Sequence, residues 1–170
     1  MNFVESYVSR AREMRSILCV GLDPTYDQVP PSMRQRNDWR ADIYYYIHSV
    51  IDIAASKVAI VKPQYAFYGA MGSDGFRILH DIVAYAVDCY LLTILDAKRA
   101  DIGNTMEAYG REVFDEIRVH AVTAVPYLGS ATIQPLMPWL KRNRCVISMV
   151  RTSNPEAAEL QDLRLEIGWI

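Results

Sequence analysis

The chain has 170 residues, of which 51% are hydrophobic and 22% are charged. This composition excludes a disordered chain, and it supplies enough apolar residues for residues 1–170 to fold as a single domain with a substantial core. The formal net charge of −2 argues against a nucleic-acid-binding surface or a basic membrane patch, so we expect a small-molecule partner.

Several features of the composition favour the cytoplasm. The three cysteines, Cys19, Cys89 and Cys145, lie in apolar stretches without a C-x-x-C spacing, so we expect buried thiols in a reducing compartment. The charged N-terminal segment does not resemble a signal peptide, and no apolar run is long enough to span a membrane. The three histidines lack ligand spacing, so we expect no metal site.

Helical patterns alternate with short apolar runs of the kind found in buried parallel strands. In chain order we expect a helix over residues 2–14, a strand over 17–22, an irregular crossing over 26–37, a helix capped by Asp38 and ending near 56, a strand over 58–61, a helix over 76–90, a strand over 91–95, a helix over 104–117, a strand over 121–125, a helix over 132–142 and a strand over 145–150.

Glycine and proline mark the expected boundaries. Residues 72–75 contain two glycines, which we expect to break the chain before the helix over 76–90. Pro135 falls in the first turn of the helix over 132–142, where a missing N–H is tolerated, whereas Pro138 weakens that helix.

The alternation of five strands with helices predicts an α/β fold built on a parallel sheet. A doubly wound sheet usually carries a G-x-G-x-x-G loop after its first strand, and the sequence GLDP at residues 21–24 lacks that pattern. We therefore favour a β/α barrel. In both architectures ligands bind at the carboxyl ends of the strands, where each of these runs meets polar or proline-bearing residues.

Charged residues follow the strand over 91–95 directly. Asp96 and Lys98 are two residues apart, so an extended backbone would point both side chains to the same face, and Asp101 follows after a turn. Lys62 stands in the same position after the strand over 58–61. Taken alone, such a pattern is more often a solvated charged loop than a catalytic site.

Five motifs, in order along the chain, favour a functional interpretation of the charged pattern. They are CVGLDP at 19–24, VKPQ at 61–64, LDAKRADIGNT at 95–105, VTAVPYLG at 122–129 and RTSNP at 151–155. Together they resemble the orotidine 5′-phosphate decarboxylases, and most closely the bacterial branch sometimes called type 2. The resemblance implies a (β/α)8 TIM barrel that converts orotidine 5′-monophosphate to UMP in pyrimidine biosynthesis, without a metal or organic cofactor.

The resemblance also implies residue roles. Lys62, Asp96, Lys98 and Asp101 match the family's charged tetrad, in which Lys98 would be the cation at the reacting carbon and then the proton donor. Asp101 is expected to reach into the active site of the neighbouring subunit, which would make a homodimer part of the mechanism.

Four further residues match the family's substrate-binding positions. Asp23 resembles the residue that binds the ribose, Ile102 and Thr105 resemble residues contributed across the dimer, and Ser153 resembles the residue that contacts the pyrimidine. Three of them also have a plain structural interpretation, since Asp23 can form a turn, Thr105 can start a helix and Ser153 can cap one.

The chain differs from the family in length. A TIM barrel has eight strands, whereas the sequence predicts about five βα units, so we expect a C-terminally truncated form. No residue matches the family's phosphate-binding arginine and glycine loop. Two alternatives therefore remain, namely an inactive fragment or interaction protein, and a magnesium-dependent sugar-phosphate decarboxylase or aldolase of the same superfamily.

Overall fold

Five parallel strands form a single sheet whose spatial order follows the sequence, β1-β2-β3-β4-β5. The computed structural model describes residues 2–34 and 37–163, so two residues of the expected crossing over 26–37 lie outside the described part. The strands are β1 (Cys19–Leu22), β2 (Ile60–Pro63), β3 (Leu92–Arg99), β4 (Ala121–Ala124) and β5 (Cys145–Ser148). The expected α/β class and parallel sheet are therefore confirmed.

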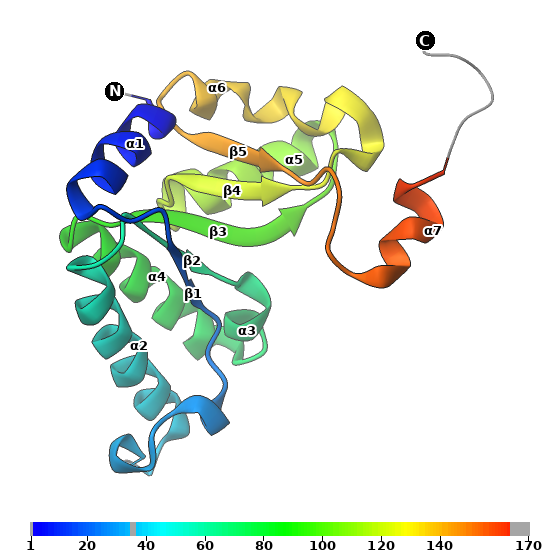
Figure 1. Cartoon of the computed structure of the whole chain (residues 1–170). Helices are drawn as coiled ribbons and strands as arrows, with labels where there is room; N and C mark the ends of the chain where they lie inside the picture. Colours follow the sequence, from blue (N-terminus) through cyan, green and yellow to red (C-terminus); the bar gives the residue numbers. More distant parts are fainter. Residues whose placement is uncertain (1, 35–36, 164–170) are drawn as a thin grey trace.

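Helical segments connect the strands, as βα units require (Figure 1). The α-helices are α1 (Phe3–Met14), α2 (Trp39–Ala55), α3 (Tyr65–Gly69), α4 (Gly72–Asp88), α5 (Gly103–Gly110), α6 (Met137–Leu140) and α7 (Ala158–Gln161). Shorter turns are η1 (Tyr26–Gln28), η2 (Pro31–Met33), η3 (Arg111–Glu116), η4 (Pro126–Thr132), η5 (Gln134–Leu136) and η6 (Pro155–Ala157). No helix within the described ranges is long and apolar enough to cross a membrane.

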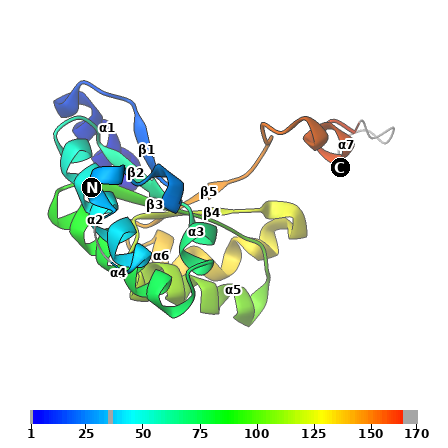
Figure 2. The same ribbon diagram turned by 90° about the horizontal axis from the view of Figure 1, so that it is seen from below.

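The main hydrophobic core lies on the outer face of the sheet. Strand residues such as Leu22, Val61 and Leu95 pack there against Ile47 of α2 and Leu79 of α4, and all five side chains are buried. Figure 2 shows α2, α4, α5 and α6 on this side of the sheet and α1 on the other. Successive side chains along a strand point to opposite faces of the sheet. The strand residues next to these buried ones therefore point to the inner face.

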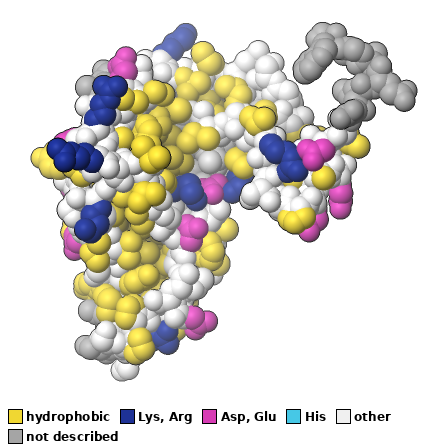
Figure 3. All heavy atoms as spheres, in the orientation of Figure 1, with side chains coloured by type: hydrophobic (Ala, Val, Ile, Leu, Met, Phe, Trp, Pro, Cys, Tyr) yellow, Lys and Arg dark blue, Asp and Glu magenta, His cyan; other side chains and the backbone are white. Residues whose placement is uncertain are grey.

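The inner face is covered only in part. A second, smaller cluster of Ile60, Ile94 and Ala121 packs against Phe3 and Tyr7 of α1. Figure 3 shows hydrophobic side chains exposed along this side of the molecule, with basic and acidic side chains together near its middle. The carboxyl ends of the strands are therefore accessible.

Helix α4 begins earlier than the glycines suggest. The expected break at residues 72–75 is wrong, because these residues form the first turn of α4. Gly75 is buried, and a Cβ atom there would lie 1.9 Å from the Tyr68 carbonyl oxygen. The glycine therefore permits close contact between α3 and α4 and does not end a helix.

The segment before β5 is less regular than expected. In place of one helix over 132–142, the chain forms η5 and the four-residue helix α6. Pro135 and Pro138 each stand near the start of one of these short segments, where the absent N–H costs nothing. The expected helix over 104–117 is also divided, since α5 continues as a π-helical turn, η3.

The expectation of three buried cysteines is wrong. Cys19 is exposed, and Cys89 and Cys145 are half-buried. Cys19 stands opposite Ile60 in the sheet register, on the inner face that α1 covers only in part. Apolar neighbours in the sequence did not reveal which face would lack a covering layer.

Candidate active site

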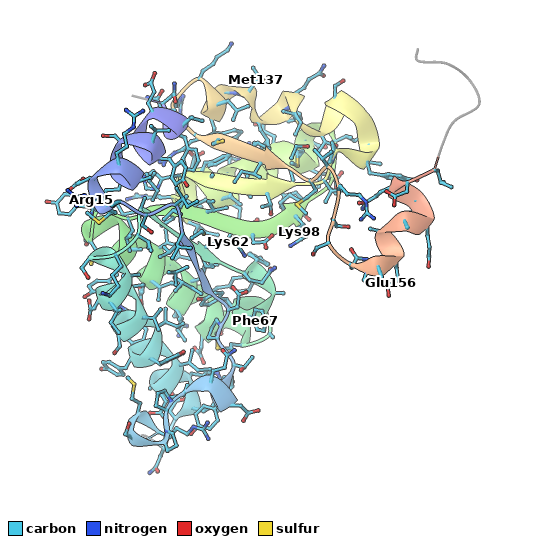
Figure 4. All side chains as sticks on the ribbon, viewed as in Figure 1. Arg15, Lys62, Phe67, Lys98, Met137 and Glu156 are labelled. Carbon is cyan, nitrogen blue, oxygen red and sulfur yellow. The ribbon has the colours of Figure 1, made fainter. Side chains whose placement is uncertain are left out.

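Three charged side chains meet at the carboxyl ends of β2 and β3. Lys62 Nζ lies 3.1 Å from Asp96 Oδ2, and Lys98 Nζ lies 2.7 Å from Asp96 Oδ1. Figure 4 shows Lys62 and Lys98 on the same side of the sheet, on adjacent strands. The carboxylate thus stands between two ammonium groups, each on a separate oxygen.

The sheet positions this cluster through its alternation and register. Lys62 is two residues beyond the inner-facing Ile60, and Asp96 is two residues beyond the inner-facing Ile94. Lys98 follows Asp96 after two more residues. β2 lies two residues later than the expected strand over 58–61, and β3 extends four residues beyond the expected end at 95, so both strands include these charged residues. An additional β-bridge between Gln64 and Asp96 holds the two strand ends side by side.

Asp96 is buried, with 9% of its surface exposed, yet it remains ionised. Burial alone would raise the pKa of its carboxyl group, but hydrogen bonds from Lys98, Lys62 and Thr123 outweigh that effect and hold the pKa below its usual value. The site therefore favours an ionised carboxylate held between two lysine side chains.

Thr123 is the member of the cluster that sequence reasoning missed. Its hydroxyl group lies 2.9 Å from Asp96 Oδ1 and receives the backbone N–H groups of Ala97 and Lys98. The residue lies in the VTAVPYLG motif at 122–129. A signal was present, since Thr123 is two residues after Ala121 in an otherwise apolar strand and so points to the inner face.

Arg99 anchors the end of β3 on the outer side. Its guanidinium lies over the rings of Tyr65 and Tyr109, with centroid distances of 4.2 and 4.3 Å, and its Nη2 is 2.7 Å from Glu112 Oε2. Tyr65 donates its phenolic proton to the same Glu112 side chain. This cluster ties β3 to α3 and α5 directly behind Lys98.

Asp23 lies just beyond β1 and carries an oxygen without a partner. Its Oδ1 is buried and receives no hydrogen bond from the described residues. A buried carboxylate oxygen without a donor is costly, so a ligand hydroxyl group would relieve it. In the described part of the chain, Asp23 forms no hydrogen bond or ion pair with Lys62, Asp96 or Lys98.

Three expected site residues in the loop after β3 and the first turn of α5 do not join the charged cluster. Asp101 is half-buried and accepts a hydrogen bond from the Ile102 backbone N–H at 2.8 Å, without an ion pair to either lysine within the described residues. Ile102 is 48% exposed, and Thr105 is exposed in the first turn of α5. All three side chains are available to a neighbouring molecule.

Ser153 also stands outside the cluster. It is exposed, in the loop that leaves β5 and leads to α7, which lies apart from the sheet in Figures 1 and 2. Within this segment Arg151 pairs with Asp162 at 2.8 Å. The structure therefore brings together Lys62, Asp96 and Lys98 but not Ser153.

A cavity of about 240 Å³ opens beside Lys98. Its lining is mostly apolar and comes from the ends of β4 and β5, including Val125, Pro126, Met149 and Val150. A larger hollow of about 640 Å³ lies between α4 and η3, but none of the charged cluster lines it. Within residues 2–34 and 37–163, no three His, Cys, Asp or Glu side chains are placed to hold a metal ion.

This arrangement suits chemistry that develops negative charge on a flat, apolar group. The cavity can take a ring, and the Lys98 ammonium at its edge can stabilise an electron pair and supply a proton. Asp96 keeps that ammonium in a fixed position.

Comparison with known proteins identifies related sequences along nearly all of the chain. Residues 16–167 match the family model described as "Orotidine 5′-phosphate decarboxylase / HUMPS family". An orotidine 5′-phosphate decarboxylase from Roseiflexus castenholzii is 40% identical over 168 residues, and one from Herpetosiphon aurantiacus is 34% identical over 166. These alignments cover 99% and 98% of this chain. The chain spans about 60% of the length of these relatives.

Solved structures show the same relationship in three dimensions. A Toxoplasma gondii protein described as an orotidine-monophosphate decarboxylase superposes with a TM-score of 0.86 at 30% identity, over 97% of this chain and 54% of its own. The Leishmania donovani OMP decarboxylase superposes with a TM-score of 0.81 at 34% identity, over 98% of this chain and 60% of its own.

Proposed function

The chain belongs to the orotidine 5′-phosphate decarboxylase / HUMPS family, and we propose that it converts orotidine 5′-monophosphate to UMP in pyrimidine biosynthesis without a metal or organic cofactor. The observation that carries this proposal is the pairing of Asp96 with both Lys62 and Lys98 at the strand ends. The chain spans about 60% of the length of its curated relatives, so their activity is a proposal for this chain.

Lys98 has the central role in the proposed reaction. When the bond between the pyrimidine carbon and the carboxylate breaks, CO2 leaves and the electron pair stays on the ring carbon. The Lys98 ammonium stabilises that charge and then transfers a proton to the same carbon, and water returns a proton to the amine. The nearby apolar cavity supports this role, because Lys98 lines it and a flat ring bound there would lie beside the ammonium group.

Asp96 and Lys62 set the electrostatics around Lys98. The carboxylate of Asp96 would face the carboxylate of the substrate, and their repulsion ends when CO2 departs. Two lysines and Thr123 donate to Asp96, so it stays ionised and cannot escape the repulsion by accepting a proton. Lys62 offsets part of the negative charge that accumulates when the substrate binds.

The remaining substrate contacts are assigned to strand-end residues. We assign ribose binding to Asp23, whose buried Oδ1 would accept a hydroxyl proton. We assign pyrimidine contact to Ser153, which requires its exposed loop to approach the cavity beside Lys98. The preceding residue, Thr152, already lines that cavity, so Ser153 is one residue away from its lining.

We also propose a cytoplasmic homodimer with shared sites. Asp101 is half-buried and Ile102 and Thr105 are exposed, in the loop after β3 and the first turn of α5, and we assign all three to the site of a second copy. Sedimentation of the purified chain would test the dimer, and a monomer at micromolar concentration would contradict it. Cell fractionation would test the location.

The decisive experiment compares UMP formation by the purified chain with that by its Lys98→Ala variant. We expect the substitution to lower turnover by about a hundredfold or more, because it removes the cation and the proton donor. Lys141→Ala, which removes an exposed lysine at the end of α6, is the matched control and should retain activity. Equal turnover by the original chain and Lys98→Ala would overturn the proposal, and loss of activity with a chelator would overturn its cofactor-free part.

A further inference from the structure

One hydroxyl group makes three contacts at the end of β3. Thr123 Oγ1 on β4 donates to Asp96 Oδ1 at 2.9 Å and accepts the N–H groups of Ala97 at 3.1 Å and Lys98 at 2.9 Å. The residue is buried, with 6% of its surface exposed. A threonine hydroxyl group has one proton and two lone pairs, so these three contacts use its full capacity.

The two backbone contacts replace hydrogen bonds that the sheet does not supply there. Leu95 stands opposite Val122, but the next pair in the register is Arg99 with Ala124. β3 therefore bulges between these pairs, and Lys98 has a φ of 46°, a left-handed conformation that side-chain-bearing residues rarely adopt. The Thr123 hydroxyl group satisfies the two N–H groups that the bulge frees.

The same contacts fix the direction of the hydroxyl proton. Ala97 N and Lys98 N are donors and cannot accept, so the Thr123 proton is left with Asp96 Oδ1 as its acceptor. Lys98 also donates to Oδ1, and Lys62 donates to Oδ2. Rotation of the Asp96 carboxylate would therefore break at least one of three hydrogen bonds.

We propose that Thr123 is a positioning residue, whose hydroxyl group shapes the β3 bulge and orients Asp96 so that the Lys98 ammonium is presented to the reacting carbon. Its effect on turnover rests on the proposed function, whereas its effect on Asp96 does not. A threonine that only filled space would not need a hydroxyl group, and this difference can be measured.

Two matched variants separate the hydroxyl group from the methyl group. Thr123→Val keeps the shape and removes the hydroxyl group, whereas Thr123→Ser keeps the hydroxyl group and removes the methyl group. Titration of the Asp96 carboxyl carbon by NMR in the whole chain should give a higher midpoint in Thr123→Val than in the unsubstituted chain, because one donor to the carboxylate is lost. Thr123→Ser should titrate like the unsubstituted chain.

Steady-state kinetics provide the second measurement. We expect Thr123→Val to lower kcat by about tenfold to a hundredfold with little change in KM, because the reacting groups move slightly while the binding contacts remain. Thr123→Ser should keep most of the turnover. Dispersed NMR spectra of both variants would confirm that they fold.

The outcomes separate the two hypotheses. If the Asp96 titration shifts in Thr123→Val alone but no form of the chain makes UMP, the positioning of Asp96 stands and the proposed function fails. If the chain makes UMP while Val and Ser variants share its titration midpoint and kcat, the function stands and this inference is overturned. Greater damage from Ser than from Val would also overturn it, because that order indicates packing by the methyl group.

Discussion

Lys98 Nζ lies 2.7 Å from Asp96 Oδ1, although only Ala97 separates the two residues on β3. Alternation along a strand puts them on one face, and the bulge at this point, with its left-handed Lys98 backbone, lets the two side chains meet. The backbone at the end of β3 therefore creates this ion pair. Its contribution to the free energy of unfolding should depend on the charge of Asp96.

Acidification should remove the stabilisation that Asp96 supplies. Its pKa is lower in the folded chain than in the unfolded chain, so the unfolded chain binds more protons as the pH falls below about 4. The stabilisation is present above that pH and is lost as the pH falls through the lower, folded value. We expect Asp96→Asn to lower the free energy of unfolding at pH 7, and the difference from the original chain to narrow at pH 3.

Urea unfolding at the two pH values would measure this difference. Asp27→Asn, at an exposed position in η1, is the control and should leave the free energy of unfolding nearly unchanged. The original chain and Asp96→Asn could instead differ in unfolding free energy by the same amount at pH 3 and pH 7. That result would show that folding does not favour the ionised form of Asp96.

His120 should make the chain less stable in mild acid. Burial, with a smaller contribution from Arg144, lowers the pKa of His120 from 6.5 to about 4, and its Nδ1 accepts the Thr93 backbone N–H. The unfolded chain therefore binds one more proton between these pH values, so stability falls as the pH drops from about 6.5 to about 4. We expect a loss of about 1–2 kcal/mol by pH 4.5, discounted because the ring is partly exposed.

The His120→Gln variant tests that assignment, because glutamine keeps an acceptor but does not titrate. The loss of unfolding free energy between pH 7 and pH 4.5 should shrink in this variant. It should persist in His80→Gln, which changes an exposed histidine of α4. An unchanged loss in His120→Gln would assign the acid sensitivity to another group.

Part of the site could be predicted from local rules in the sequence. The apolar runs predict the five parallel strands, which form part of a TIM barrel, and a period of two predicts that Asp96 and Lys98 share a face. The grouping of Lys62 with these two residues is predicted from the resemblance of the five motifs. The role of Thr123 depends on a register shift between β3 and β4. The spacing from Ala121 indicates that Thr123 points to the inner face, but the register shift is a long-range property that no spacing along the sequence indicates.

The role of Gly75 is a second feature that depends on long-range packing and could not be predicted from the sequence. A glycine pair suggests a break, but Gly75 is needed because α3 and α4 are close in space. We expect Gly75→Ala to lower the free energy of unfolding by about 1–3 kcal/mol, because the new methyl group would overlap the Tyr68 carbonyl. Denaturant unfolding would measure the loss.

Gly69→Ala is the matched control for that substitution. Among the described residues, a Cβ atom at Gly69 would have only the Tyr65 ring as a near neighbour, at 3.8 Å, which is an ordinary contact. The control should cost little or slightly stabilise α3. An equal loss in both variants would contradict the packing role of Gly75.

Mixing two inactive variants should restore activity if the proposed dimer shares its sites. Lys98→Ala removes the ammonium from its own site, and Asp101→Ala removes the carboxylate that would enter the partner's site. In a mixed dimer, one site receives Lys98 from one copy and Asp101 from the other, so that site is intact. Random exchange should therefore recover about a quarter of the original turnover.

UMP formation after the two variants are unfolded and refolded together would measure this recovery. Lys98→Ala mixed with a Lys98→Ala, Asp101→Ala double variant is the control, because no combination of these two chains contains Lys98. Asp101 accepts the Ile102 N–H and contacts neither lysine within its own described chain, which is the arrangement that a shared site requires. Activity of Asp101→Ala alone near that of the original chain, or no recovery on mixing, would exclude a catalytic contribution of Asp101 across a dimer.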